Sequence, residues 1–297
     1  MATTTQSTSV PASRAAAPPV RKSRKDSNWG HPIVYFAALV LIAMMIGPVL
    51  YIIIGGFRTN SQITANPAGL PHPWVIGNYI DVLASGTFWR QVGNSTIAAL
   101  ATTAGVVVLG VMASFVLARY EFRGRGVMYA LFAAGLMFPI TVAITPLYIL
   151  VKNLGLVNTL PGIILPQIAF GLPTTIIILV PFLQAIPKEI EEAAAIDRCS
   201  RLGFFWRMVL PLSVPGLITA GILAFIASWN SYLLPLFILN GQDTFTLPLG
   251  VQAFASQYSV DTAKVLAFTS LSMIPALVFF SLFERRIVGG LTGAVKG

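Results

Sequence analysis

Charged residues are scarce in this 297-residue chain: Asp, Glu, Lys and Arg make up only 10% of it, whereas 56% of its residues are hydrophobic. A soluble domain usually carries about 25% charged residues, so this composition indicates a membrane protein. Cys199 stands alone and the two histidines, His31 and His72, lie far apart. An intrachain disulfide is therefore excluded, and no clustered ligands for zinc are present.

The long uncharged stretches lack the groups that several membrane chemistries need. Proton-coupled carriers generally keep Asp, Glu, His or Lys inside the bilayer, and none occurs in the apolar cores of these stretches. A membrane enzyme would need a nucleophile with its base or a metal motif such as H-E-x-x-H, which are also missing. The chain has no phosphate-binding G-x-x-x-x-G-K-[ST] loop. We therefore expect a non-enzymatic chain without catalytic residues, metal or cofactor, which takes any energy for transport from another polypeptide.

Six uncharged stretches contain an apolar core of about 18–20 residues, which is enough for a helix to cross about 30 Å of hydrocarbon. We predict an all-α membrane protein with six transmembrane helices, at about residues 32–54, 94–118, 127–151, 160–186, 216–239 and 264–284. Two further uncharged stretches, 59–80 and 244–260, are rich in Asn, Pro, Gln and Ser and are predicted to be connections.

Residues 1–29 consist mainly of Ser, Thr, Ala, Pro, Lys and Arg, so we expect a disordered basic tail ahead of a transmembrane domain over residues 30–297. The apolar stretch that follows the tail is too long for the apolar region of a signal peptide and has no A-x-A cleavage site. We interpret it as an uncleaved first span.

Lysine and arginine are distributed unevenly between the two sides of the predicted helices. One side carries 15 of the 19 basic residues, and the other carries Arg58, Arg90, Lys152 and Lys264. The positive-inside rule makes the first side cytoplasmic and places both termini inside the cell. Because the basic residues follow this topology, the net charge of +9 does not favour nucleic acid as a partner.

The cytoplasmic connection between the fourth and fifth spans, residues 187–215, contains four of the ten acidic residues. Pro187 suits the first position of a helix, acids favour its early turns, and three consecutive alanines continue it. Ser200 can cap a second, aromatic-rich helix that Pro211 interrupts. Two interpretations follow: a loop at the membrane interface with its aromatics buried, or a short helix that docks in a groove of a soluble partner.

The sequence EEAAAIDRCSRLGFFWRMVLPL resembles the EAA loop of ABC-importer permeases, with matches at Glu192, Ala193, Ala194, Asp197, Leu210 and Pro211. The resemblance implies that this loop is a coupling helix that docks on a separate ATPase. The implied coupling residues are Glu191, Glu192, Ala193, Ala194, Asp197, Arg198, Ser200 and Gly203. Arg198 stands where the family usually has glycine, so we expect a different turn or an added charge contact there.

The resemblance covers the chain from His31 to Gly297. The segments GLVNTLPGIILPQIAFGLP, WNSYLLPLFIL and RRIVGGLTGAVKG are similar to the carbohydrate-uptake branch, in particular to the six-span, maltose-type subunit. This implies a permease domain and a heterodimer with a second permease subunit. It also implies a location in the plasma membrane and two further partners. One is a dimer of ABC subunits, which binds the ATP, and the other is an extracellular solute-binding protein.

A sugar is neutral and rich in hydroxyls, so its path should offer amides, hydroxyls and aromatic faces. The candidates in the predicted spans are Asn94, Thr141, Thr145, Gln167, Trp229, Asn230 and Tyr232. Each could instead form a helix–helix hydrogen bond or an interfacial anchor. Two other functions remain open: an ABC permease for a peptide or glycerol phosphate, and a sodium-coupled carrier with helices broken at Gly47-Pro48 or Pro139.

Overall fold

Every regular element in the computed structural model is a helix across residues 32–254 and 260–295, the part of the chain that the structure describes. The predicted all-α class is confirmed for these residues. The tail predicted at residues 1–29 lies outside them. The chain divides into two units, residues 1–46 and residues 47–297.

Helix α1 (Pro32–Gly55) begins in the first unit and ends in the second. It contains no charged residue, and its apolar side chains cover its whole circumference. A helix that is apolar all round suits a lipid environment. Pro48 lies inside α1 without ending it, so the break considered at Gly47-Pro48 does not occur.

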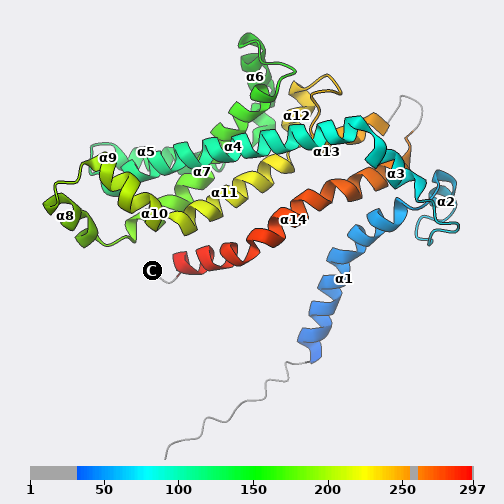
Figure 1. The fold of residues 1–297 in the computed structure, drawn as a ribbon, viewed down its shortest axis with the longest axis horizontal. Helices are drawn as coiled ribbons and strands as arrows, with labels where there is room; N and C mark the ends of the chain where they lie inside the picture. The colour runs from blue at the N-terminus through cyan, green and yellow to red at the C-terminus, as the bar shows by residue number, and fades with distance from the viewer. Residues whose placement is uncertain (1–31, 255–259, 296–297) are drawn as a thin grey trace, which may run out of the picture. The chain divides into compact units, whose positions relative to one another are not determined.

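The second unit is built on three long helices that pack against one another, α4 (Gly86–Arg119), α7 (Leu160–Gln184) and α11 (Val214–Trp229); α14 (Thr262–Val295) packs on α11 (Figure 1). Glycine allows α4 and α7 to approach closely. A Cβ atom on Gly110 would lie 2.4 Å from Thr175 Cγ2, and one on Gly171 would lie 2.7 Å from Val106 Cγ2. Small residues commonly permit such contacts between membrane helices.

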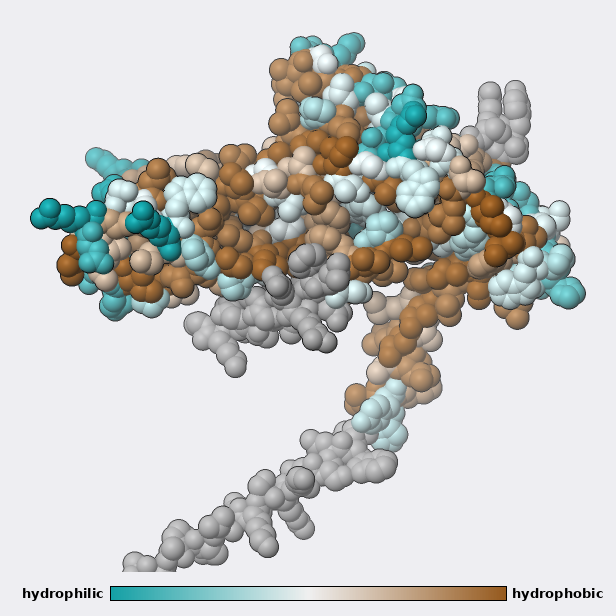
Figure 2. Space-filling model, in the orientation of Figure 1, coloured by the Kyte–Doolittle hydropathy of each residue, from teal (hydrophilic) through white to brown (hydrophobic). Residues whose placement is uncertain are grey.

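Within the described part of the chain, four helices are long and apolar enough to cross a membrane: α1, α4, α7 and residues Thr262–Ser281 of α14. The number rises to six if each of two sharply bent helix pairs counts as one span. In Figure 2 the long helices present a mostly hydrophobic surface, and hydrophilic residues gather at the end that carries α8 and α9. This distribution fits a protein embedded in lipid.

The predicted span over residues 127–151 is not one continuous helix. The chain forms α5 (Arg125–Gly135) and α6 (Ile140–Asn153), which are bent by 100° at the intervening break. Pro139 precedes α6 in an extended conformation. Proline lacks an N–H group and disfavours a helical residue before it, which explains why α5 does not continue into α6.

The fifth predicted span, 216–239, is also interrupted. Helix α11 ends at Trp229, and the short helix α12 (Leu233–Ile238) follows after three residues. At its other end α11 is bent by 74° from the segment Arg201–Leu212. That segment comprises α9 (Arg201–Phe204), the π-helix η1 (Phe205–Val209) and α10 (Leu210–Leu212).

The two stretches predicted as connections contain only short helices in the described residues: α2 (Asn60–Ala65), α3 (Gly77–Ala84), α13 (Leu247–Gly250) and η2 (Val251–Phe254). Arg58 organises the first connection. Arg58 is only 2% exposed, and its guanidinium donates to the carbonyls of Gln62, Asn66 and Pro67. A buried cation needs such partners, and these three bonds tie residues 62–67 to Arg58.

Candidate functional site

The charged connection folds as a helix, a turn and a second helix, as predicted. Helix α8 (Lys188–Ile196) has Glu189 and Glu191 in its first turn, where acids favour the positive end of the helix dipole. Pro187 lies one residue ahead of the helix, as its N-cap, and not at its first position. The chain then turns, and the Ser200 hydroxyl accepts a hydrogen bond from the Gly203 amide at 3.1 Å, which caps α9.

Arg198 adopts the left-handed backbone conformation, with φ of 53°. Of the two alternatives expected at Arg198, a different turn or an added charge contact, the structure does not show the first, because arginine takes the conformation that glycine adopts most easily. For a residue with a side chain this conformation costs about 1–2 kcal/mol. Arg198 therefore carries the backbone strain of the turn between α8 and α9.

Ala194 faces the protein's own interior. It is only 4% exposed and belongs to a cluster that includes Leu183, Ile186, Phe204 and Phe205. The expectation that Ala194 forms part of an exposed docking face is wrong, because the small side chain lets α8 lie against this cluster. Ala193 and Ala195, on either side of it, are exposed.

An ion pair holds α8 to the end of α4. Arg119 Nη1 lies 3.6 Å from Glu191 Oε2, and Arg119 Nη2 donates to the Ile186 carbonyl at 2.7 Å. The Arg119 side chain is only 5% exposed, whereas that of Glu191 is 43% exposed. Glu191 therefore makes an internal contact that positions α8.

The residues that remain available at the tip are both acidic and apolar. Glu192, Asp197 and Ser200 are exposed, and Gly203 is half-buried. Ile196 is 83% exposed and Leu202 is 69% exposed. Sequence reasoning missed these two residues, although apolar side chains beside acids in a water-facing loop are a signal for a contact surface.

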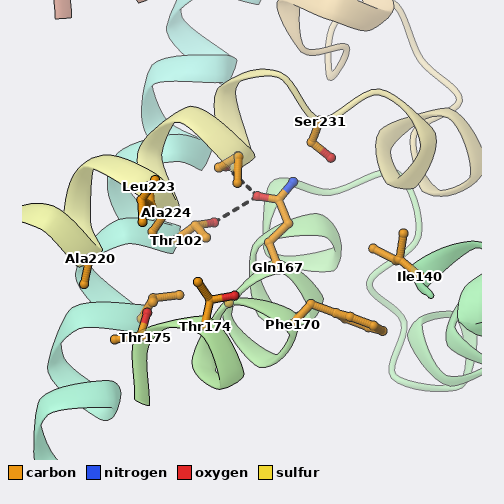
Figure 3. A pocket seen from close by; sticks show the side chains of 14 residues that line it. Thr102, Ile140, Gln167, Phe170, Thr174, Thr175, Ala220, Leu223, Ala224 and Ser231 are labelled. Atoms are coloured by element: carbon orange, nitrogen blue, oxygen red, sulfur yellow. Dashed lines mark hydrogen bonds between the residues drawn. The ribbon is translucent and has the colours of Figure 1, made fainter. Parts of the chain in front are cut away.

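The second site is a cavity of about 200 Å³ between α4, α7 and α11 (Figure 3). Gln167 of α7 is its main polar residue. The Gln167 carbonyl oxygen accepts hydrogen bonds from the hydroxyls of Thr102, at 3.1 Å, and Ser228, at 2.5 Å. Its amide nitrogen points away from Thr102 and donates no hydrogen bond to any of the described residues. Two hydroxyls thus orient the amide and leave its donor side free.

The rest of the cavity wall is uncharged. Hydroxyls come from Thr174, Thr175 and Ser231, and Phe170 supplies an aromatic ring. Ile140, the first residue of α6 after the bend, also lines the cavity. Of the predicted path residues this cavity includes only Gln167. Its hydroxyl partners were missed because their facing positions depend on how three helices pack.

The other predicted path residues lie elsewhere. Asn94 donates to the carbonyls of Asp243 and Phe245 at 2.8 and 3.0 Å and so ties α4 to a connecting loop. Thr141 and Thr145 are exposed on α6. The Tyr232 hydroxyl accepts a hydrogen bond from Gln252 at 3.3 Å.

Trp229 is 4% exposed and stacks on Phe225, with ring centroids 5.7 Å apart. It belongs to a hydrophobic cluster with Leu247 and Phe268, which gives it a packing role. Trp229 and Asn230 also line a separate cavity of about 520 Å³ bordered by α11, α13 and α14. The two predicted neighbours are therefore not part of the Gln167 cavity.

Comparison with known proteins places these features in a family. Residues 106–288 match the family described as "Binding-protein-dependent transport system inner membrane component". The chain is 33% identical to the "Diacetylchitobiose uptake system permease protein NgcG" of Streptomyces coelicolor, over 94% of this chain and 91% of that protein. It is 36% identical to the "Trehalose transport system permease protein SugB" of Mycobacterium tuberculosis, over 89% of this chain and 97% of that protein.

A solved structure supports the same architecture. The fold is similar to a chain in the crystal structure of a bacterial ABC transporter involved in the import of the acidic polysaccharide alginate. The TM-score is 0.74 at 21% sequence identity, and the match covers 86% of this chain and 95% of the other.

Proposed function

The chain belongs to the family of binding-protein-dependent transport system inner membrane components, and from this premise we propose that it is the permease subunit of an ATP-driven carbohydrate importer. It forms part of the path for a sugar or oligosaccharide and is itself non-enzymatic. A second permease, an ATP-binding subunit dimer and an extracellular solute-binding protein complete the assembly. The names of the relatives NgcG and SugB support a carbohydrate as the cargo.

The arrangement of Gln167 is the observation that carries the choice of cargo. A free amide donor, neighbouring hydroxyls and an aromatic ring line one uncharged cavity. Such groups pair with sugar hydroxyls, whereas a phosphate-bearing cargo favours a basic residue. The cavity wall has no basic residue among the described residues.

Uptake by the reconstituted complex, with its binding protein and a panel of neutral oligosaccharides, tests this proposal. We expect Gln167→Leu to lower sugar-stimulated uptake about tenfold, because a buried partner left unpaired costs roughly 1–3 kcal/mol. Thr102→Val should have a smaller effect, since it removes one of the two bonds that orient the amide. Thr103→Val is the control, because the Thr103 hydroxyl bonds to the Ala99 carbonyl and does not line the cavity. Equal uptake by Gln167→Leu and Thr103→Val would exclude Gln167 from the path.

For the tip, we propose that α8 and the turn after it are the ATPase-coupling element. Glu192 and Asp197 would offer charge, and Ile196 and Leu202 would offer apolar contact area. Glu191 and Ala194 would hold the element in place from the inner side. Alternating access would follow when the ATPase subunits close and draw the coupling elements together.

Co-purification of the ATPase subunit with the permease tests this role. Ile196→Ser and Glu192→Lys should each reduce recovery of the ATPase while leaving the permease folded, because both side chains are exposed. The Glu192→Lys defect should be larger at low salt, since screening weakens contacts between exposed charges. The control is Glu189→Lys, which makes the same charge reversal on the first turn of α8. Full ATPase recovery with both tip variants would reduce the segment to a surface loop.

The proposed orientation has a separate test. After Cys199→Ser, single cysteines at Glu121 and Glu192 should react only with a reagent inside the cell. A cysteine at Leu70, which is 75% exposed in the first connection, should react only from outside. Labelling of the Glu192 position from outside would contradict both the orientation and the coupling role.

A further inference from the structure

An apolar groove with a volume of about 610 Å³ runs along the outside of α4. One wall is α4 from Val107 to Val116, and the other is formed by Arg201, Leu202, Phe205, Trp206 and Leu210. Met112 is 54% exposed and Trp206 is 59% exposed, so the groove is open to its surroundings. The proposed coupling surface shares only Leu202 with this groove, and the Gln167 cavity shares no lining residue with it.

A single cation stands at one end of this groove. The Arg201 guanidinium lies over the Tyr120 ring, 5.1 Å from its centroid. No carboxylate in the described part of the chain forms an ion pair with it. The rest of the wall is hydrocarbon and aromatic. The groove therefore combines a long apolar slot with one positive charge at its mouth.

The position of the groove along α4 matches one leaflet of a bilayer. Nine residue steps from Val107 to Val116 span about 14 Å at 1.5 Å per residue, which is close to half of the roughly 30 Å hydrocarbon thickness. Tyr120 follows the end of α4 at Arg119, and both Tyr120 and Trp206 line the groove. Tyrosine and tryptophan favour the membrane–water interface, so Arg201 lies at the depth of lipid headgroups.

We propose that this groove binds an anionic phospholipid, with an acyl chain along α4 and the phosphate at Arg201. A phospholipid supplies hydrocarbon and a negative charge at the required depths. A transmembrane helix of another subunit rarely offers an acid at the edge of the hydrocarbon. Basic pockets beside membrane helices are suited to such headgroups.

The lipid would contact the segment that leads from the tip into the membrane. Phe205 lines the groove, and it also packs in the cluster that holds Ala194. Phe115 of α4 also belongs to both the groove and this cluster. Phe205 begins the π-helical turn, a feature that often occurs at functional sites. A bound phospholipid therefore steadies the segment that positions α8.

The test uses the whole importer complex in nanodiscs of phosphatidylcholine alone or of an equal mixture with phosphatidylglycerol. Native mass spectrometry counts retained phosphatidylglycerol, and sugar-stimulated ATP hydrolysis is measured in parallel. Arg201→Gln should weaken phosphatidylglycerol retention about fivefold, as expected for one basic residue at an anionic lipid surface. It should also remove the difference in ATPase rate between the two lipid compositions. Arg201→Lys should keep much of both effects.

Arg123→Gln provides the matched control, because Arg123 is exposed just beyond Tyr120 and does not line the groove. Equal loss of phosphatidylglycerol in Arg123→Gln and Arg201→Gln would overturn the proposal in favour of general surface charge. Efficient crosslinking of a Met112→Cys variant, made on Cys199→Ser, to the second permease would show that protein fills the groove. Lower co-purification of the ATPase with Arg201→Gln in phosphatidylcholine alone, where no anionic lipid is present to be lost, would assign Arg201 to that subunit. Either result also overturns the proposal.

Discussion

The Gln167 cavity and the tip around α8 are built in opposite ways. Around the cavity, long helices lie close together through glycine, and polar side chains bond to one another inside an uncharged space. At the tip, a nine-residue helix keeps Glu189 and Glu192 exposed, and Ala194, Glu191 and a few aromatic residues hold its inner side. Polar side chains thus point inward around the cavity, whereas at the tip they point outward from a helix whose inner face is buried.

This difference shows that residues of one motif can have separate roles. Glu192 and Asp197 are exposed, whereas Ala194 is internal. A substitution at the tip can therefore weaken docking or weaken the permease itself, depending on which face of α8 it changes. Variants that separate weaker docking from lower stability of the permease therefore test this difference between the faces of α8 most directly.

Ala194→Leu should have the largest effect on stability. It forces a bulky side chain into a closed cluster, and overpacking costs about 1–3 kcal/mol. The exposed neighbour Ala195 is the control, because Ala195→Leu should leave the unfolding temperature unchanged while lowering ATPase recovery. Thermal unfolding of the purified permease in detergent separates the two outcomes. Equal unfolding temperatures for both variants would mean that Ala194 is not a buried anchor.

The sequence predicts a good part of this design. Long uncharged stretches indicate the membrane class, and acids before a serine cap predict the helix–turn–helix tip. It does not reveal which alanine faces inward, because that depends on the cluster formed by Leu183, Phe204 and Phe205. The contacts of Gln167 with Thr102 and Ser228 are equally hidden, since those residues lie on separate helices.

The broken third span was within reach of sequence reasoning. Pro139 is a possible helix break, yet the uncharged stretch around it predicts one span because its length suits a membrane crossing. Length and hydropathy measure how much apolar chain is present. They do not report the direction that a chain takes after a proline, and here the bend is 100°.

Gly110→Ala should have the next largest effect, on the region around the Gln167 cavity. The new methyl group would lie 2.4 Å from Thr175 Cγ2, so α4 and α7 must separate at a cost of about 1–2 kcal/mol. Gly93→Ala on the same helix has open space around it. It should be neutral or stabilising by up to about 1 kcal/mol, because alanine favours a helix over glycine. Thermal unfolding of the purified permease is again the measurement. A shift of the unfolding temperature in the same direction for both variants would contradict close packing of α4 and α7.

The smallest expected effect is a gain, from Arg198→Gly at the turn of the tip. Glycine relieves about 1–2 kcal/mol of strain at a left-handed position but makes the unfolded chain more flexible, at a cost of about 0.4–1 kcal/mol. The net stabilisation should be about 0.5–1 kcal/mol. Asn158 has a similar φ of 60°, but its side-chain oxygen accepts hydrogen bonds from the amides of Asn240 and Gly241 at 3.0 and 2.9 Å. Asn158→Gly should therefore destabilise the protein. Comparing the two variants separates the effect of relieved backbone strain from the effect of lost hydrogen bonds.

The same Arg198→Gly variant decides whether the arginine also has a role in docking. If its side chain contacts the ATPase, the variant should unfold at a higher temperature and yet retain less ATPase, because the exposed charge is lost while the turn is kept. Undiminished ATPase recovery together with a higher unfolding temperature would restrict Arg198 to the backbone turn. A lower unfolding temperature would contradict the strain at this position, since removing the side chain cannot then relieve it. The pair of measurements thus tests the turn and the contact surface separately, at the one residue where the tip departs from the family's glycine.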